Sequence, residues 1–321
     1  MNEPKQLDKF DQRMIEWSMN DLFKRDCPIC TEPKQTQIFI RPDLLNIYYC
    51  KNCSTFFISP APSSDQIIAF YKNYESAYRA EFNIPKYLLK KTLMYTDPMS
   101  DLRLKELSRF MDFNGANCFD IGFGRARYLY LIKKLGGHPF GNEYNSDSIE
   151  IAKYLGINNV YHNDISFLNF NNFFDLVSMN DIIEHPLEPM ILMENVVKMT
   201  KKGGLISVWT PNGSCGVNRH DNLTYRVDLE HMQYFTKDTF KYVAEKFNLE
   251  ILQIIPSGKP ILFGIENKIT DWDRFKYASK NLIKYVPGFF PVYSVLKNGK
   301  NKKIDSFRAG DYNLFCIFRK K

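Results

Sequence analysis

The sequence lacks any apolar run of the roughly 18 to 20 residues that a bilayer-spanning helix requires. The nearest approach, from Val286 to Leu296, is eleven residues long and contains two prolines. The first thirteen residues mix acidic and basic side chains and include no apolar stretch, so they do not resemble a secretory signal peptide. We therefore expect a cytoplasmic protein without a membrane-spanning anchor.

An excess of basic charge is also missing from most of the chain. The formal net charge is +7, but the residues from Val286 onward alone contain eight Lys or Arg against two Asp. A protein that grips a phosphate backbone usually spreads its basic residues over one face or groove. The charge is thus only weak support for a nucleic-acid partner. The length of 321 residues allows one large domain and one small one.

Four of the seven cysteines form two CxxC pairs, Cys27 with Cys30 and Cys50 with Cys53. Two such pairs can present four thiolates to one tetrahedral ion, which is the ligand shell of structural Zn²⁺. The segment between the pairs is apolar and β-rich, as a ribbon hairpin would be. Two disulfides would also fit the count, but a reducing cytoplasm disfavours them. We predict a structural zinc ribbon over residues 23–60.

The remaining chain divides around this ribbon. We expect an N-terminal helical segment over residues 1–22, a helical connector or lid over 61–112, and the largest domain over 113–321. A helix that begins near Ser63 or Ser64 should place four apolar side chains on one face: Ile67, Ile68, Tyr71 and Tyr74. An insertion at about 271–304 combines aromatic residues with lysines. Residues 284–303 could rest on an anionic membrane, although a lid or an ordinary hydrophobic patch is the simpler interpretation.

Residues 117–157 have the pattern of a strand, a glycine turn, a helix, a strand and a second helix. The turn runs from Asp120 to Gly124, and the first helix is expected from Ala126 to Leu135. The second strand, over residues 138–142, places Glu143 about 20 residues beyond the glycines. At that distance an acidic side chain can bind both hydroxyls of a ribose.

A glycine turn with a downstream acid also occurs in NAD-binding domains, so the third glycine decides between the two families. In the NAD pattern it would stand at position 127, which is occupied by Arg127, a side chain too large for close helix–strand contact. The series Asp120, Gly122, Gly124 and Ala126 instead resembles class I S-adenosylmethionine-dependent methyltransferases. Ala126 replaces the usual third glycine and is expected to fit a first helical turn. The resemblance implies S-adenosylmethionine as the cofactor, with its ammonium near Asp120.

The resemblance continues through the second half of the chain and implies an α/β, Rossmann-like fold. Its seven-stranded, doubly wound sheet would end in an antiparallel strand. Family members place an acidic and an apolar residue beside the adenine after the third strand, and these are Asp164 and Ile165 here. Asn180, at the end of the fourth strand, should also touch the cofactor. The double CxxC segment and residues 230–252 resemble bacterial small-molecule methyltransferases of the ubiquinone-type group.

Only five histidines are present, and two of them are expected in loops at the carboxyl edge of the sheet, His185 and His231. Either one could act as the base for an acceptor hydroxyl. Asp181, Glu184 and His185 also resemble the metal-binding E-x-x-E-H of ubiquinone-type O-methyltransferases, with aspartate in place of the first glutamate. That match would add a divalent ion such as Mg²⁺. The alternative, which we prefer, is a loop braced by these residues without metal.

Three functions remain open on the sequence alone. We favour a methyltransferase acting on a small-molecule acceptor, such as a sugar or another intermediate of surface-polymer or quinone-like biosynthesis. A zinc-ribbon methyltransferase of ribosomal or transfer RNA is an alternative. The fourth strand exits as Asn180-Asp181-Ile182-Ile183 and has no N-P-P-Y to stack a flipped base. The third possibility is a catalytically inactive binding module or scaffold.

Overall fold

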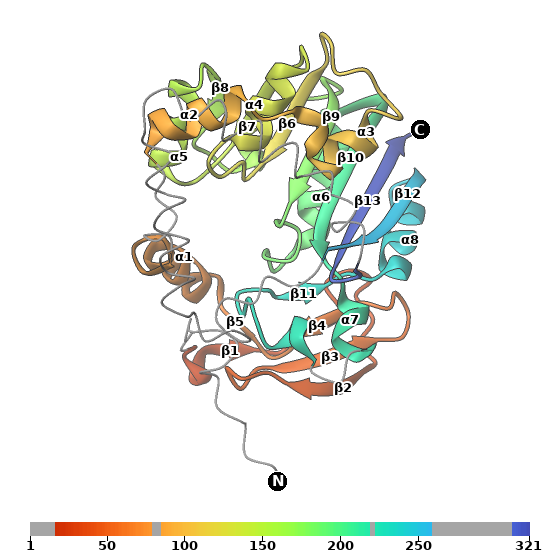
Figure 1. The fold of residues 1–321 in the computed structure, drawn as a ribbon. Coiled ribbons are helices and arrows are strands. Elements are labelled where there is room, and N and C mark those ends of the chain that lie inside the picture. The colour runs from red at the N-terminus through yellow and green to blue at the C-terminus, as the bar shows by residue number, and fades with distance from the viewer. Residues whose placement is uncertain (1–16, 79–84, 219–221, 259–309) are drawn as a thin grey trace.

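The computed structural model describes residues 17–78, 85–218, 222–258 and 310–321. A seven-stranded sheet in the order β12-β13-β10-β9-β6-β7-β8 forms its centre (Figure 1). The strands are β6 (Asn117–Ile121), β7 (His138–Asn142), β8 (Asn159–Tyr161), β9 (Phe174–Asn180), β10 (Thr200–Pro211), β12 (Leu249–Ser257) and β13 (Asn313–Lys320). Only β13 runs antiparallel to its neighbours, β10 and β12. The predicted Rossmann-like sheet with an antiparallel last strand is confirmed.

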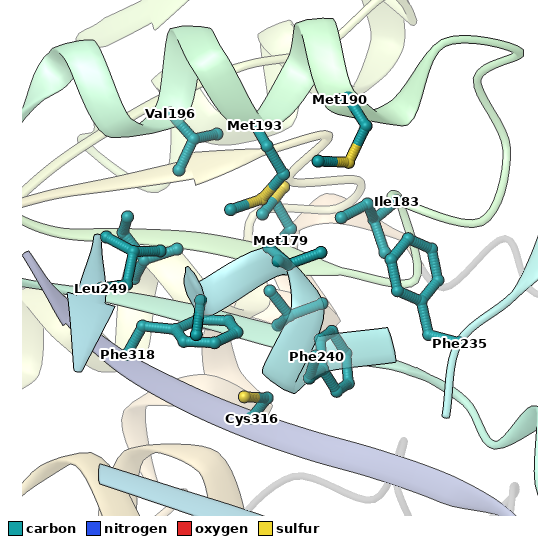
Figure 2. Packing of buried hydrophobic residues seen from close by; sticks show 14 of the residues in the cluster. Met179, Ile183, Met190, Met193, Val196, Phe235, Phe240, Leu249, Cys316 and Phe318 are labelled. Atoms are coloured by element: carbon teal, nitrogen blue, oxygen red, sulfur yellow. The ribbon is translucent and has the colours of Figure 1, made fainter. Parts of the chain in front are cut away.

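Helices cover both faces of this sheet because side chains alternate along each strand. Cys118 and Phe119, neighbours on β6, belong to two different hydrophobic cores. The core of Cys118 packs against α3 (Leu102–Leu107) and α4 (Arg127–Lys134). The core of Phe119 packs against α6 (Pro189–Met199) and α8 (Lys237–Lys246), and Figure 2 shows side chains of both helices converging there. A third cluster joins α2 (Lys86–Met94) and α5 (Ser146–Tyr154) to α4.

The segment with the two CxxC pairs contributes to a second, four-stranded sheet in the order β11-β4-β3-β2. Its strands are β2 (Gln35–Ile40), β3 (Asn46–Cys50), β4 (Phe56–Ile58) and β11 (Gln233–Tyr234). Because β11 follows β10 in the chain, the sheet combines the ribbon with a distant segment. Residues on both sides of β11 bond to segments that leave β9 and β10, since Met232 donates to the Glu184 carbonyl and Gly213 to that of Phe235. The ribbon therefore lies next to the carboxyl edge of the large sheet.

The connector begins with α1 (Ser64–Tyr78), whose buried face differs from our expectation. Ile67 and Phe70 pack against the hydrophobic cluster of the ribbon, whereas Ile68 is 52% and Tyr71 38% exposed. The expectation that Ile67, Ile68 and Tyr71 share one packed face was wrong. Apolar residues occupy two sides of this helix, so the spacing alone could not select the packed side. The side chain of Tyr74 lies outside the described residues.

Local details differ from the sequence expectations in two further places. The Gly203-Gly204 pair, a dipeptide typical of turns, lies inside β10, where the pairing with β9 shifts register between Thr200 and Leu205. Gly203 has a φ of +77°, so the pair forms an irregularity in the strand. The first helix of the cofactor region begins at Arg127 and ends at Lys134.

The remaining elements are short. They are η2 (Met19–Asp21), β1 (Leu22–Phe23), β5 (Ala61–Pro62), η4 (Pro98–Ser100), η5 (Ile165–Phe167), α7 (Gly213–Asn218) and η6 (Leu223–Tyr225). Among the described residues, no helix has the length and apolar character needed to cross a bilayer. Residues 1–16, most of the expected N-terminal helical segment, lie outside the described residues. So does the whole insertion at 271–304, including residues 284–303, for which we considered membrane contact.

Candidate active site

Asp120 stands near the end of β6, an inner strand of the sheet between β9 and β7, and is 2% exposed. Its Oδ1 accepts hydrogen bonds of 2.8 Å from Ser178 Oγ and from Asn180 Nδ2. Burial raises the pKa of Asp120 to about 7, although these two bonds and the charge of Arg103 act in the opposite direction. The carboxyl group is thus held in a fixed position between two strands, and a nearby cation would favour its ionised form.

The turn after β6 depends on two glycines with left-handed backbone. Gly122 has a φ of +61°, and a Cβ built there would lie 2.3 Å from the Cδ1 of Ile182. Gly124 has a φ of +53°, and its amide donates a 2.7 Å hydrogen bond to Glu143 Oε2. The turn therefore lies against the Ile182 side chain and the end of β7, and its left-handed backbone would be strained by any residue with a side chain at position 122.

Glu143 directly follows β7, at the position predicted from the sequence. Its Oε1 accepts from the amides of Tyr144, at 2.8 Å, and Asn145, at 3.2 Å. Together with the Gly124 bond, these contacts fix the carboxylate between the glycine turn and the start of α5. A carboxylate held this way at the carboxyl edge can accept from two neighbouring hydroxyls.

Ala126 requires a correction. We expected it to fit the first turn of a helix, but it is the N-cap residue of α4 and has a left-handed φ of +57°. Its side chain is fully buried. Left-handed backbone costs an L-residue about 1 kcal/mol or more, which explains why glycine is usual at this position of the family. The burial of the methyl group offsets part of that cost.

Asp164 and Ile165 lie after β8, next to the end of β7. Asp164 caps η5 by accepting from the Ser166 amide, and its Oδ2 accepts a 2.7 Å bond from the Tyr144 hydroxyl. Burial alone would raise the pKa of Asp164, but these hydrogen bonds lower it below its usual value. Ile165 is 5% exposed and packs into the core, while Tyr144 is 64% exposed. An ionised carboxylate and apolar surface thus lie side by side.

Asn180 ends β9 and contributes both ends of its amide to the site. Its Nδ2 donates to Asp120, whereas its buried Oδ1 has no hydrogen-bond partner among the described residues. An unsatisfied buried carbonyl oxygen costs about 1 to 3 kcal/mol. A donor such as the cofactor's ammonium would satisfy it, so this residue fits the group that the sequence implies.

The two candidate bases lie together at the carboxyl edge. His185 follows β9 and His231 precedes β11, and their ring centroids are 4.8 Å apart. The Nδ1 of His185 is also 2.7 Å from the hydroxyl of Tyr71, which α1 brings to this edge. His231 is 5% exposed, whereas His185 is half-buried. The fold thus brings together three groups that can exchange protons.

Glu184 stands directly behind this pair and is fully buried. Its Oε2 accepts from Thr210 Oγ1 at 2.9 Å, and Oε1 has no partner among the described residues. Burial, and next the charge of Asp181, raises the pKa of Glu184 well above its usual value. Glu184, His185 and His231 each place a ligand atom within 4.8 Å of the others, and Asp181 is not part of this group.

Mg²⁺ prefers an octahedral set of oxygen ligands. The group around Glu184 offers it two imidazoles and only one carboxyl group. Asp181 lies outside the group and is exposed. Partial loss of its hydration raises its pKa to about 6, although the charge of Arg103 acts in the opposite direction. These residues do not fit Mg²⁺, and the methyl transfer that we propose does not use this ion.

Arg103, at the start of α3, is a site residue that the sequence did not reveal. Its guanidinium donates to both carboxylate oxygens of Asp101, at 3.0 and 2.8 Å. It lies 4.8 Å from the ring centre of Tyr128. Its charge opposes the rise that burial causes in the pKa of Asp120 and of Asp181. An Asp-x-Arg sequence at a helix start is too common to indicate a site. Only the packing of α3 against the sheet shows that Arg103 supplies positive charge here.

The four ribbon cysteines meet as predicted. The Sγ atoms of Cys27 and Cys53 are 3.4 Å apart, as are those of Cys30 and Cys50, and all four lie within 4.8 Å of one another. The structure joins none of these four cysteines in a disulfide. Sulfurs around tetrahedral zinc stand about 3.8 Å apart, given Zn–S bonds of about 2.3 Å. The cluster therefore fits a four-sulfur zinc site.

Comparisons with known proteins agree with this geometry. Residues 96–254 match a family described as a methyltransferase domain. No curated protein matches the sequence. A methyltransferase of Archaeoglobus fulgidus is 20% identical and superposes with a TM-score of 0.44, over 78% of this chain and 100% of its own.

A second solved structure is the 1,6-didemethyltoxoflavin-N1-methyltransferase of Burkholderia thailandensis, with its substrate and S-adenosylhomocysteine bound. It is 13% identical, with a TM-score of 0.48 over 90% of this chain and 99% of its own.

The matched range, 96–254, includes every residue that we predicted to touch the cofactor. Within it the strand order places an acid and a G-x-G turn at the end of β6, beside a second acid at the end of the neighbouring β7. The antiparallel β13 completes the arrangement. Residues 96–254 thus form a methyltransferase domain, and the sheet has the Rossmann-like strand order of class I S-adenosylmethionine-dependent methyltransferases.

Proposed function

We propose that the methyl group is transferred to a small-molecule acceptor beside His185 and His231, and that one of these histidines takes the acceptor's proton. The observation that supports this most directly is the contact of the two rings, 4.8 Å apart, at the edge where the glycine turn lies. An imidazole is half-protonated near neutral pH, so it can accept a proton from a hydroxyl as that hydroxyl becomes a nucleophile.

The cofactor half of the proposal uses the residues along the ends of β6 to β9. Glu143 would accept from the two ribose hydroxyls, and Asp164 and Ile165 would bind the adenine. Asp120 and Asn180 would hold the ammonium, and the left-handed Gly122 and Gly124 give it room at the turn. Bound there, S-adenosylmethionine supplies a sulfonium methyl group to a nucleophile in line with the breaking bond.

The acceptor that we favour is a sugar or another intermediate of surface-polymer or quinone-like biosynthesis, a class that rests on sequence resemblance. A nucleic acid fits the ribbon less well. Arg25 donates to the carbonyls of Ile58, Leu187 and Met232, and Arg41 is fully buried. Both arginines of the ribbon thus donate to the protein's own backbone and are not presented to the phosphates of a nucleic acid.

We also propose that Cys27, Cys30, Cys50 and Cys53 hold Zn²⁺ in a structural role. Four sulfur ligands complete the tetrahedron and leave no position for a catalytic water. Cysteines that bind zinc must stay reduced, and for this reason we also propose a cytoplasmic location.

The test is a calorimetric titration of the purified protein with S-adenosylhomocysteine, with NADH as the control ligand. We expect micromolar binding of the first and none of the second. A screen of small-molecule acceptors for methyl release would follow, with single alanine variants of His185 and His231 to identify the base. Folded protein that fails to bind S-adenosylhomocysteine would contradict the proposed function.

A further inference from the structure

The loop that holds His231 is built against the zinc ribbon as well as against the methyltransferase domain. Gln233 and Tyr234 form β11 and pair with Phe57 and Phe56 of β4. The amide of Ile58 donates to the Met232 carbonyl and extends this pairing by one bond. The segment that contains a candidate base is therefore an edge strand of the ribbon's own sheet.

Arg41 is the strongest link across this boundary. It stands in the turn between β2 and β3, where its amide donates to the Leu45 carbonyl, and its side chain is fully buried. The guanidinium donates to the carbonyl oxygens of His231, at 2.7 Å, and of Leu229, and to the hydroxyl of Tyr234, at 3.1 Å. One side chain thus donates to His231 itself and to a residue on each side of it in the chain.

Asp43 keeps this guanidinium in place. Its carboxylate accepts from both the Nε and an Nη of Arg41 and from the indole nitrogen of Trp17, at 2.9 Å. Burial by itself would lower the pKa of Arg41, but Asp43 raises it above its usual value, so the charge persists. A buried arginine is retained at such a position only when its donors are satisfied, because an unpaired buried charge is strongly destabilising.

The opposite side of the same loop is held by the methyltransferase domain. The Met232 amide donates to the Glu184 carbonyl at 2.8 Å, and the His231 amide donates to the Asp228 carbonyl. The backbone around His231 is therefore fixed between the β9 exit loop and Arg41. Since His185 belongs to that exit loop, Arg41 helps to set the distance between the two rings.

We propose that Arg41 is a positioning residue for His231. Through Arg41, the zinc ribbon holds the loop of His231 in place on the acceptor side of the catalytic centre. This inference rests on the proposed function, in which His231 is a candidate base. The described contacts of Asp120, Glu143 and Asp164 involve no residue of the ribbon. The ribbon therefore controls the acceptor side and leaves the cofactor side unchanged.

The test uses the full chain with zinc bound and histidines labelled for NMR. Because there are only five histidines, single variants can assign the ring resonances. In Arg41→Lys we expect the His231 resonance to shift and the contact between the His185 and His231 rings to weaken. Lysine keeps the charge but cannot reach Asp43 and three acceptors with one planar group. Resonances of His162, beside Tyr144 on the cofactor side, and of His138, at the amino end of β7, should not move.

Two controls separate positioning from general damage. Lys34→Met removes an exposed cation from the same ribbon and should leave all five histidine resonances unchanged. S-adenosylhomocysteine should bind Arg41→Lys within about twofold of the wild-type affinity, and removal of zinc with a chelator should shift His231 in the same direction. With an acceptor in hand, kcat should fall roughly 10- to 100-fold.

Two results would overturn the inference. One is an unmoved His231 resonance in folded Arg41→Lys. The other is a loss of S-adenosylhomocysteine affinity as large as the loss of turnover, which would make Arg41 a general structural residue. If wild-type protein itself fails to bind S-adenosylhomocysteine, the proposed function fails instead, and the NMR result still decides whether Arg41 positions His231.

Discussion

The cofactor side and the acceptor side of this site are built in different ways. The cofactor side comes from one continuous stretch, Asp120 to Asn180, in which each residue stands at the end of a consecutive strand or in the turn that follows it. The acceptor side gathers Tyr71 from the connector, His185 from the exit of β9 and His231 from a segment paired with the ribbon. The comparison teaches that the proposed cofactor side is local in sequence, whereas the proposed acceptor side depends on contacts between distant segments of the chain.

The largest expected effect lies on the acceptor side. Alanine at His231 or His185, whichever is the base, should lower methyl transfer by roughly 10²- to 10⁴-fold, because a positioned base contributes about that much. Binding of S-adenosylhomocysteine, measured by calorimetry, should stay within about twofold. His138→Ala, at the exposed amino end of β7, is the matched control and should keep full activity. An equal loss of cofactor affinity in the base variant would show that the acceptor side and the cofactor side do not act separately.

On the cofactor side, Asp120 should make the stability of the ligand-free protein depend on pH. Burial raises its pKa to about 7, and an unfolded chain titrates near 4. Between these values the folded state holds a proton that the unfolded state has lost, so the free energy of unfolding falls as pH rises. The full effect is on the order of 4 kcal/mol, at about 1.36 kcal/mol per pKa unit.

The measurement is the Tm from pH 5 to pH 8 for the wild type and Asp120→Asn. Asn keeps an oxygen for the Ser178 and Asn180 donors but does not titrate, so its Tm should fall less over this range. Bound cofactor should reduce the difference, because its ammonium favours the ionised carboxylate. Parallel Tm curves for the two ligand-free proteins would show that Asp120 does not titrate in this window.

Glu143→Ala should weaken S-adenosylhomocysteine binding by roughly 10- to 150-fold. A hydrogen bond to a charged group is worth about 1.5 to 3 kcal/mol, and the variant also removes the acceptor of the Gly124 amide. Calorimetric titration gives the affinity directly. Glu150→Ala, an exposed glutamate of α5 paired with Lys86, should bind like the wild type. Equal affinities for Glu143→Ala and wild type would place the ribose elsewhere.

The smallest effect is expected at Ala126. Glycine there relieves the left-handed backbone but loses a buried methyl group worth about 0.8 kcal/mol, so the free energy of unfolding should change by less than about 1 kcal/mol. Ala152, buried within α5, offers the contrast. Ala152→Gly loses the methyl and the helix preference together and should cost about 2 kcal/mol. Denaturant unfolding compares the two, and equal losses would mean that position 126 is not strained.

The sequence by itself determined the parts of the protein that depend on short spacing. The strand, glycine turn and helix predicted Asp120, Gly122, Gly124 and Glu143 in place because each element spans few residues. The two CxxC pairs are equally local. Each pair closes a tight turn, and the short hairpin of β2 and β3 between them brings the four thiols together. Residues 117–145 needed no knowledge of the rest of the chain, because neighbouring parallel strands end at the same edge.

Tertiary structure decided the parts in which distant segments meet. Nothing in the sequence around Arg41 or Arg103 marks either residue, because their roles come from partners that α3 and β11 bring to them. The packed face of α1 was misjudged for the same reason, since a helix with apolar residues on two sides is oriented only by what it packs against. Local spacing fixes where a backbone turns, whereas the fold as a whole decides which side chains share the acceptor side.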